Sequence, residues 1–226
     1  MIPASQHKTL YLFTLLLLLL IAACSTPTTS PSPTAATTAA TSTTPPLTDD
    51  FEPPNPAWAR FETAESAVYA QAGELYLEDR GKGIGVYAPL AGKTYTDVVA
   101  TVQVRHVQGT LNNWMGVICR QQDEENYYLL AISADGFYLI MLVDDGAPTP
   151  LVGPETSDNI HTGKARNNLE VRCVGDALSL SVNGERLATH TNDTLREAGA
   201  VALFADAVER GETAVTAFDN FSLSQP

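Results

Sequence analysis

The sequence predicts an all-β protein: an antiparallel β-sandwich that follows a signal peptide and a disordered linker. Apolar and polar residues alternate in short segments from residue 49 onward, which is the pattern of half-buried strands. Turn sequences separate these segments at short intervals, and no segment carries a sustained helical stripe. An apolar run and a stretch rich in Ser, Thr, Pro and Ala precede the strands and predict the signal peptide and the linker.

The apolar run Leu10–Ile21 follows His7 and Lys8 and is mostly leucine. A membrane-spanning helix needs about 20 apolar residues, so this run of 12 is typical of a cleaved signal. Residues 21–24 then read Ile-Ala-Ala-Cys, and we predict a signal peptide over 1–23. An ordinary secretory signal with an incidental cysteine and an uncleaved signal anchor are the alternatives.

Residues 25–48 contain only Ser, Thr, Pro and Ala, apart from Leu47. Such a segment has no charge and too little apolar surface to offset the entropy of ordering, so we predict a disordered tether over 24–48. Fully extended it would span roughly 75 Å, and as a flexible coil about 27 Å. We therefore expect the tether to let the parts attached to its two ends lie far apart.

The order of signal, small residues, cysteine and tether resembles that of a bacterial lipoprotein, in which the cysteine is lipidated. The resemblance assigns lipidation to Cys24 and implies that the lipid holds the protein on a membrane. It implies an extracytoplasmic location, either at the cell surface or on the periplasmic face.

The remaining chain, 49–226, is one domain's worth of sequence. It contains all 26 acidic residues and 12 of the 13 basic ones, which gives a net charge of about −14. An acidic surface argues against nucleic acid and anionic membranes as partners. Sugars, calcium and basic protein surfaces remain compatible, and the acidity alone also keeps an exported protein soluble.

The strands are predicted in order along this domain. Segment 98–105 places Val and Ala on one face. Segment 126–133 is rich in β-formers, and Asp135-Gly136 predicts a hairpin to 137–143.

A second hairpin is the strongest in the chain. Segment 169–174 turns into 178–182, and Asn183-Gly184 predicts a type I′ turn into 186–190. Segments 199–205 and 214–223 complete the domain.

Two cysteines remain after Cys24, and each lies in an alternating apolar segment. An oxidising exported compartment permits a disulfide between Cys119 and Cys173. A disulfide between them closes a loop of more than 50 residues, which contributes roughly 4 kcal/mol to stability. Two buried free thiols and metal ligation are the alternatives, although neither cysteine has a CxxC partner or a nearby histidine pair.

Several motifs in chain order resemble the concanavalin A-like lectin/glucanase superfamily, including laminin G-like jelly rolls and keto-disaccharide hydrolase-like domains. The motifs are Asp49-Asp50-Phe51, Gly116–Arg120, Asn126-Tyr127-Tyr128, Gly136-Phe137-Tyr138, Asn168–Val171, Leu180–Gly184 and Phe218–Phe221. The resemblance covers 49–226 and implies a jelly roll whose terminal strands, near Phe51 and Phe221, pair with each other.

Catalysis is not indicated by the motifs. Glycosidases of this superfamily carry a Glu-x-Asp-x-x-Glu strand, because acid and nucleophile must flank one bond. The densest acidic run here is Asp123-Glu124-Glu125, which reads as a solvated turn, and no Gly-x-Ser-x-Gly exists. The histidines at 106, 161 and 190 lie in polar contexts and are expected on the surface.

We therefore predict a domain that binds carbohydrate or a surface protein without catalytic residues. The alternatives are an enzyme of the keto-disaccharide hydrolase-like type and a purely structural envelope protein. Sugar recognition uses aromatic platforms with planar polar groups. Trp114, Arg120, Tyr128 and Tyr138 are the candidate binding surface, since Trp114 and Arg120 share strand parity. The alternative is that the aromatic residues belong to the core and Arg120 is a salt-bridged edge residue.

Calcium is the one cofactor that the resemblance suggests. If the terminal strands pair, Asp49, Asp50 and Asp219 approach each other and offer hard oxygen ligands. Capping of strand-end turns is the alternative role for these carboxylates.

Overall fold

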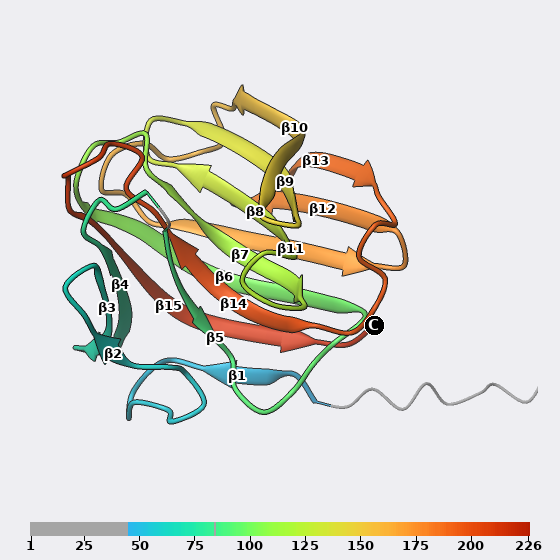
Figure 1. Ribbon diagram of the computed structural model, residues 1–226, viewed down its shortest axis with the longest axis horizontal. Coiled ribbons are helices and arrows are strands. Elements are labelled where there is room, and N and C mark those ends of the chain that lie inside the picture. The colour runs from blue at the N-terminus through green and yellow to red at the C-terminus, as the bar shows by residue number, and fades with distance from the viewer. Residues whose placement is uncertain (1–44, 84) are drawn as a thin grey trace, which may run out of the picture. The chain divides into compact units, whose positions relative to one another are not determined.

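The structure is a computed structural model that describes residues 45–83 and 85–226. These residues form fifteen strands in two antiparallel sheets, packed face to face (Figure 1). The predicted all-β sandwich is therefore confirmed. Within these two ranges no helix is long and apolar enough to cross a membrane. The predicted signal peptide, the lipidation of Cys24 and nearly all of the tether lie outside the described residues.

The larger sheet has the order β13-β12-β11-β6-β15-β4-β3-β2, and β1 also pairs with β15. Its strands are β1 (Leu47–Asp49), β2 (Phe61–Glu62), β3 (Ser66–Gln71), β4 (Glu74–Asp79), β6 (Val98–Gln108), β11 (Asn167–Val174), β12 (Ala177–Val182), β13 (Glu185–Thr191) and β15 (Ala214–Ser224). Asp49 of β1 lies opposite Phe221 of β15. The expected pairing of the terminal strands is thus confirmed.

The smaller sheet has the order β10-β9-β8-β7-β14-β5. Its strands are β5 (Val86–Pro89), β7 (Trp114–Gln121), β8 (Tyr127–Ser133), β9 (Phe137–Asp144), β10 (Ala147–Thr156) and β14 (Ala200–Ala205). In Figure 1 this sheet overlies the nine-stranded sheet.

Both predicted hairpins are present. β8 and β9 pair around Asp135-Gly136, and β12 and β13 pair around Asn183-Gly184. Asn183 has φ 53° and Gly184 has φ 89°, as the two central positions of a type I′ turn require. The short-range turn chemistry therefore sets the register of these strands.

The core lies between the sheets and is built by the period-two pattern. The predicted apolar face of β6, formed by Val98, Ala100, Val102 and Val104, is buried. Beyond β1, Trp58 packs against Phe221, with ring centroids 4.9 Å apart. Its indole N–H donates to Oδ2 of Asp49 at 2.8 Å, which satisfies both polar groups in the interior.

A disulfide joins Cys119 of β7 to Cys173 of β11, and both cysteines are fully buried. The predicted disulfide is confirmed, and the free-thiol and metal-ligand alternatives are wrong. Because β7 and β11 belong to different sheets, the bond links the two layers across the core.

Replacement of both cysteines, in Cys119→Ser/Cys173→Ser, is expected to lower the free energy of unfolding by about 2–5 kcal/mol, because the cross-link restricts the unfolded chain. Urea unfolding with and without reductant measures this loss. The native protein should lose stability on reduction, whereas the double variant should be insensitive to reductant. Equal unfolding midpoints for oxidised and reduced native protein would contradict the prediction.

Candidate functional site

The outer face of the six-stranded sheet is apolar. An antiparallel sheet that covers a core on one side normally presents polar residues to solvent on the other. Here the outward positions form a second apolar cluster, separate from the main core. Its buried members are Ile118, Leu129, Ala131, Leu139, Ala202 and Phe204, and Tyr87, Trp114, Tyr127 and Met141 pack around them while partly exposed. This face therefore departs from the usual pattern in a way that suits a ligand.

Three adjoining hollows of about 270, 360 and 670 Å³ lie along this face. Trp114 and Val208 line both the first and the second hollow. Gly85 and Tyr127 line both the second and the third. We call this continuous depression the groove. Its first hollow also contains Phe137.

Three of the four exposed large apolar side chains in the described residues line the groove. In the described part of the chain the four are Phe61, Leu111, Phe137 and Val208. Phe137 and Val208 line the first hollow, and Phe61 lines the third. Apolar surface that gathers in this way marks a binding surface more often than scattered exposed residues do.

Small residues form the floor of the groove. Gly116 of β7 lies between Phe204 of β14 and Ala131 of β8 in the sheet register. A Cβ at Gly116 would lie 2.2 Å from the carbonyl oxygen of Leu130, so no other residue fits there. A Cβ at Gly85 would lie 2.7 Å from the ring of Phe204. The two glycines thus keep the floor low between aromatic side chains.

Asp206 is the carboxyl at the centre of the groove. It follows β14, and its Oδ1 accepts a hydrogen bond from the backbone N–H of Trp114 at 2.7 Å. Burial raises its pKa to about 7; the hydrogen bond from Trp114 opposes the shift, and the negative charge of Asp79 adds to it. A titratable group shifted in this way and placed in a cleft is a typical feature of a functional site.

The tyrosines of the groove are held as neutral phenols. Burial, and then the charge of Asp206, raise the pKa of Tyr127. Burial, followed by the charge of Glu124 and a hydrogen bond to it, raises the pKa of Tyr87 to about 12. Both phenols therefore remain hydrogen-bond donors and acceptors at neutral pH.

Of the four residues predicted as a binding surface, only Trp114 lies in the groove. Arg120 is 1% exposed and points into the interior. Its guanidinium donates to the carbonyl oxygens of Thr96 at 2.8 Å and Leu195 at 3.1 Å, and also to that of Gly175. The prediction of a surface role for Arg120 is wrong. Of the alternative, a salt-bridged edge residue, the ion pair is present, with Asp97 at 3.4 Å, but β7 lies inside the sheet and not at its edge.

A β-bulge explains the error. Ala202 lies opposite Ile118 but Ala200 lies opposite Gln121, so β7 carries one extra residue there. Arg120 has φ 50° at this point. The shared parity of Trp114 and Arg120 is lost across the bulge.

Tyr128 and Tyr138 also point inward and belong to the core, as the alternative interpretation held. The hydroxyl of Tyr128 donates to Oδ1 of Asn192 at 2.5 Å, and that of Tyr138 donates to Oε2 of Glu155 at 2.8 Å. Tyr127 and Tyr87, which do line the groove, were missed. The opposite parity of Tyr127 and Tyr128 was the available signal.

The structure does not gather the three aspartates predicted as calcium ligands. Asp49 accepts from the N–H of Phe51 and the indole of Trp58, and Asp50 accepts from the N–H of Glu52. Asp219 contacts Arg166 and the N–H of Asn220. No three His, Cys, Asp or Glu side chains within 45–83 and 85–226 are placed to hold a metal ion. Turn capping describes Asp49 and Asp50 better.

Two other sequence expectations have different outcomes. Glu124 and Glu125 are exposed in the β7–β8 turn, as predicted, but they also line the third hollow of the groove. His106 was expected on the surface and is buried, which lowers its pKa. Its position on β6 turns the ring inward, since it has the same parity as Val102 and Val104.

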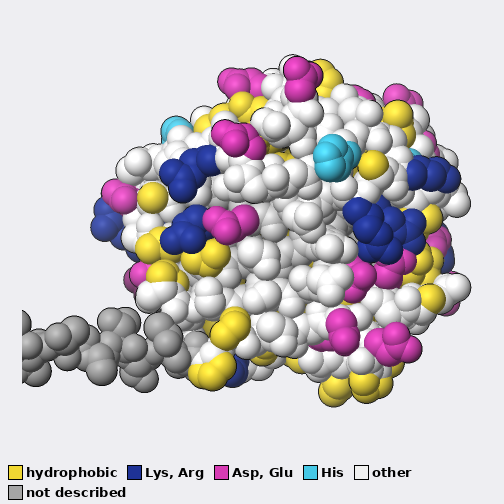
Figure 2. Space-filling model, turned by 180° about the vertical axis from the view of Figure 1, so that it is seen from behind, with side chains coloured by type: hydrophobic (Ala, Val, Ile, Leu, Met, Phe, Trp, Pro, Cys, Tyr) yellow, Lys and Arg dark blue, Asp and Glu magenta, His cyan; other side chains and the backbone are white. Residues whose placement is uncertain are grey.

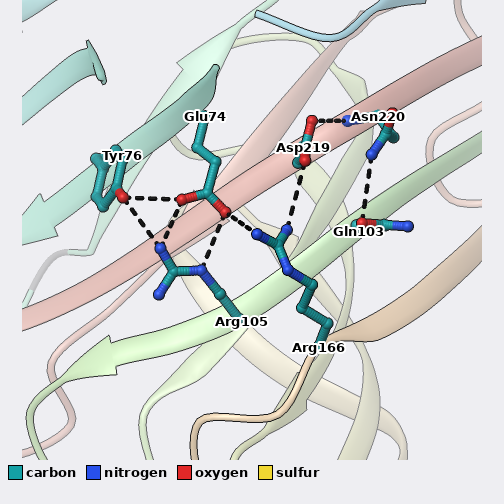
Figure 3. A network of polar contacts seen from close by, with 7 residues as sticks. All are labelled: Glu74, Tyr76, Gln103, Arg105, Arg166, Asp219 and Asn220. Atoms are coloured by element: carbon teal, nitrogen blue, oxygen red, sulfur yellow. Dashed lines mark hydrogen bonds and ion pairs between the residues drawn. The ribbon is translucent and has the colours of Figure 1, made fainter. Parts of the chain in front are cut away.

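The opposite face, on the nine-stranded sheet, has a different character. Acidic and basic side chains intermingle over it (Figure 2). Glu74 forms ion pairs with Arg105 and with Arg166, which also contacts Asp219 (Figure 3). Hydrogen bonding from Arg105 is the main cause that lowers the pKa of Glu74 to about 2. These charges neutralise one another and tie β4, β6 and β15 together.

A hollow of about 570 Å³ lies beside β1 and β15, lined by Asp50, Glu52 and prolines 53, 54 and 56 among others. Phe221, the one aromatic residue lining it, is 1% exposed. This hollow therefore offers a ligand little aromatic surface to stack on.

No protein-family model matches the sequence, and no curated protein matches it. The fold is similar to that of several solved structures. Carbohydrate-binding module CBM66 from Bacillus subtilis aligns with a TM-score of 0.59 and 15% identity over 75% of this chain and 96% of the module. A β-glucanase from Bacillus licheniformis aligns with a TM-score of 0.58 and 11% identity over 80% of this chain and 98% of the enzyme.

The GH43 protein BlXynB of Bacillus licheniformis is also similar, with a TM-score of 0.57 and 14% identity. The alignment covers 79% of this chain but 39% of that protein, so this chain spans about two fifths of its length. At these identities the similarity shows a β-sandwich fold shared with carbohydrate-active proteins.

The raised pKa of Asp206 predicts a pH dependence of stability. Its value of about 7 in the folded protein exceeds the ordinary 3.8, so the folded state binds more protons between these values. Stability should therefore fall as pH rises from about 4 to about 7. Asp206→Asn keeps an acceptor for the Trp114 N–H and should remove this fall, with a gain of roughly 4 kcal/mol at pH 8.

Urea unfolding of native protein and variant between pH 4 and 8 measures this effect. Asp158→Asn, at an exposed position after β10, is the matched control and should leave the pH profile unchanged. An Asp206→Asn profile parallel to that of the native protein would contradict the prediction.

Proposed function

We propose that this chain is a membrane-anchored, extracytoplasmic protein whose sandwich domain binds carbohydrate in the groove of the six-stranded sheet. The observation that carries the proposal is the continuous apolar groove with Trp114, Tyr127 and Tyr87 along it. The structural neighbours support the same class of ligand, since they include a carbohydrate-binding module and carbohydrate-active enzymes.

The lining of the groove suits the two-sided chemistry of a sugar ring. A pyranose presents C–H groups on its faces and hydroxyls at its rim. Half-exposed rings such as Trp114 and Tyr127 offer apolar surface for the faces. The neutral phenols and the carboxyls at the groove margin offer donors and acceptors for the hydroxyls.

The length of the groove favours an internal segment of a polymer over a single terminal sugar. Three hollows follow one another and share lining residues, so a chain entering the first can continue through the third. Rings placed at intervals can then contact successive sugar units.

The anchor completes the proposal. Lipidation of Cys24 would hold the chain on a membrane, and the tether over 25–48 would let the domain reach material roughly 30 to 70 Å away. A double or triple acyl chain gives stable attachment, whereas one chain binds reversibly.

A second candidate is a glycan-processing enzyme of the keto-disaccharide hydrolase-like type. The observation that favours it is Asp206, a carboxyl with a pKa of about 7 that lines the groove and is suited to general-acid chemistry. Asp79, whose negative charge helps to raise the pKa of Asp206, is 1% exposed. It accepts hydrogen bonds from the N–H groups of Gly81 and Ala207. Turnover of an oxidised disaccharide that is lost in Asp206→Asn would support this alternative.

Trp114→Ala and Tyr127→Ala are each expected to weaken polysaccharide binding about 10-fold, since stacking on an aromatic ring contributes about 1 kcal/mol or more. A polysaccharide array identifies the ligand, and isothermal titration measures its affinity. Tyr69→Ala is the matched control, because Tyr69 is a half-buried tyrosine stacked on Tyr76 in the other sheet.

Binding should survive in Tyr69→Ala. If the native protein binds no polysaccharide, or if Trp114→Ala binds as tightly as the native protein, the groove is not the glycan site.

Cys24→Ser is expected to release the protein from the membrane, because the acyl chains have no other attachment point in the proposed anchor. Fractionation of expressing cells followed by mass spectrometry of the N-terminus measures the change. The variant should be soluble after cell lysis, and the native protein should carry acyl mass on Cys24. Membrane association that persists in the variant argues for an uncleaved signal anchor.

A further inference from the structure

We infer that the groove selects a polysaccharide with free amino groups, such as a polymer of glucosamine, over uncharged or acidic glycans. The inference rests on the proposed function and adds the chemical class of the ligand.

Each of the three hollows contains at least one carboxyl group. Asp135 lines the first, Asp206 the second, and Glu124 and Glu125 the third. None of the described residues that line the hollows is a lysine, arginine or histidine. At pH 6 Asp206 is mostly protonated, because its pKa is about 7. A ligand that enters the groove therefore meets the negative charge of Asp135 in the first hollow and of Glu124 and Glu125 in the third, and no positive charge from the described lining.

Seven acidic groups outside the groove pair with arginine, as in the pairs of Glu74 with Arg105 and of Glu78 with Arg80. The ion pairs found within 45–83 and 85–226 include no carboxyl from the groove. The negative charge of the groove is thus left for a ligand to neutralise.

The surroundings make this charge effective. A pair of opposite charges attracts several times more strongly at the dielectric typical of a protein surface than in bulk water. The apolar walls of the groove, including Phe204 and Leu139, exclude water from one side of a bound chain. An ammonium group on a sugar would be attracted, and a carboxylate or sulfate would be repelled by the same amount.

The aromatic lining favours an aminated sugar chain over a basic peptide. Trp114, Tyr127 and Tyr87 line the hollows that hold the carboxyls, so the groove offers stacking surfaces and charge together. A glucosamine unit carries an apolar ring face and an ammonium group on one rigid ring. A lysine side chain has no such face, and its charge lies at the end of a flexible stem.

The test compares three hexasaccharides with the same β-1,4 backbone: glucosamine, N-acetylglucosamine and glucose. Binding to the full chain is measured by isothermal titration at pH 6, where the glucosamine amines are charged. The glucosamine hexamer should bind at least ten-fold more tightly than the other two. This advantage should shrink in 0.5 M salt, because salt screens charges that remain partly exposed.

Glu124→Gln/Glu125→Gln should lose most of this advantage, because it removes the negative charge of the third hollow. The matched control is Asp176→Asn/Glu185→Gln, which removes two exposed charges next to β12 of the other sheet. The control should behave like the native protein, which separates a local effect from the net charge of −13.

Each other outcome is decisive. Uncharged hexamers that bind as tightly as the glucosamine hexamer overturn the inference and leave the proposed function standing. Absence of binding to all polysaccharides overturns both. A hexalysine peptide that binds as tightly as the glucosamine hexamer and does so equally in Trp114→Ala identifies a basic-peptide surface and overturns the inference.

Discussion

The buried guanidinium of Arg120 is the constraint on which one end of the sandwich depends. A charged group away from water must be hydrogen-bonded, or its desolvation destabilises the fold. Arg120 meets this requirement with carbonyls of Thr96, Leu195 and Gly175, which lie in three loops far apart in sequence. The neighbouring Cys119 bonds to Cys173 of the other sheet. Cys119 and Arg120, the two residues of the bulge, therefore hold both sheets and three loops in place.

The same bulge divides β7 into two functional parts. Before it, Trp114, Gly116 and Ile118 lie on the outward face and contribute to the groove. After it, the side chain of Arg120 points into the interior. Gly199 closes this arrangement, because a Cβ there would lie 2.4 Å from the backbone of Arg120. A single extra residue thus separates the ligand-facing half of the strand from the half that secures the loops.

The local chemistry of the sequence was enough to predict the strands, the Asn183-Gly184 turn and the bond between Cys119 and Cys173. It was enough for Trp114 as well, because nothing interrupts the parity of β7 before the bulge. It was not enough for Arg120, because hydrogen bonds to distant loops stabilise the bulge. The groove was missed for a related reason. Tyr87, Tyr127 and Phe204 lie on three strands, and only the cross-strand register brings them together.

The edges of the six-stranded sheet bear on what the groove is for. An exposed edge strand can pair with another chain, and proline blocks this because it lacks an N–H donor. β10, at one edge, carries Pro148, Pro150 and Pro154, and β5, at the other, carries Pro89. The chain thus protects both edges against strand addition yet leaves Phe137 and Phe61 exposed beside the groove. Each ring is a little over one third exposed, so it forgoes roughly 1 kcal/mol of what full burial would contribute. A sheet with blocked edges and an open apolar face is suited to a partner that lies across its strands, as a sugar polymer does, and unsuited to one that extends them.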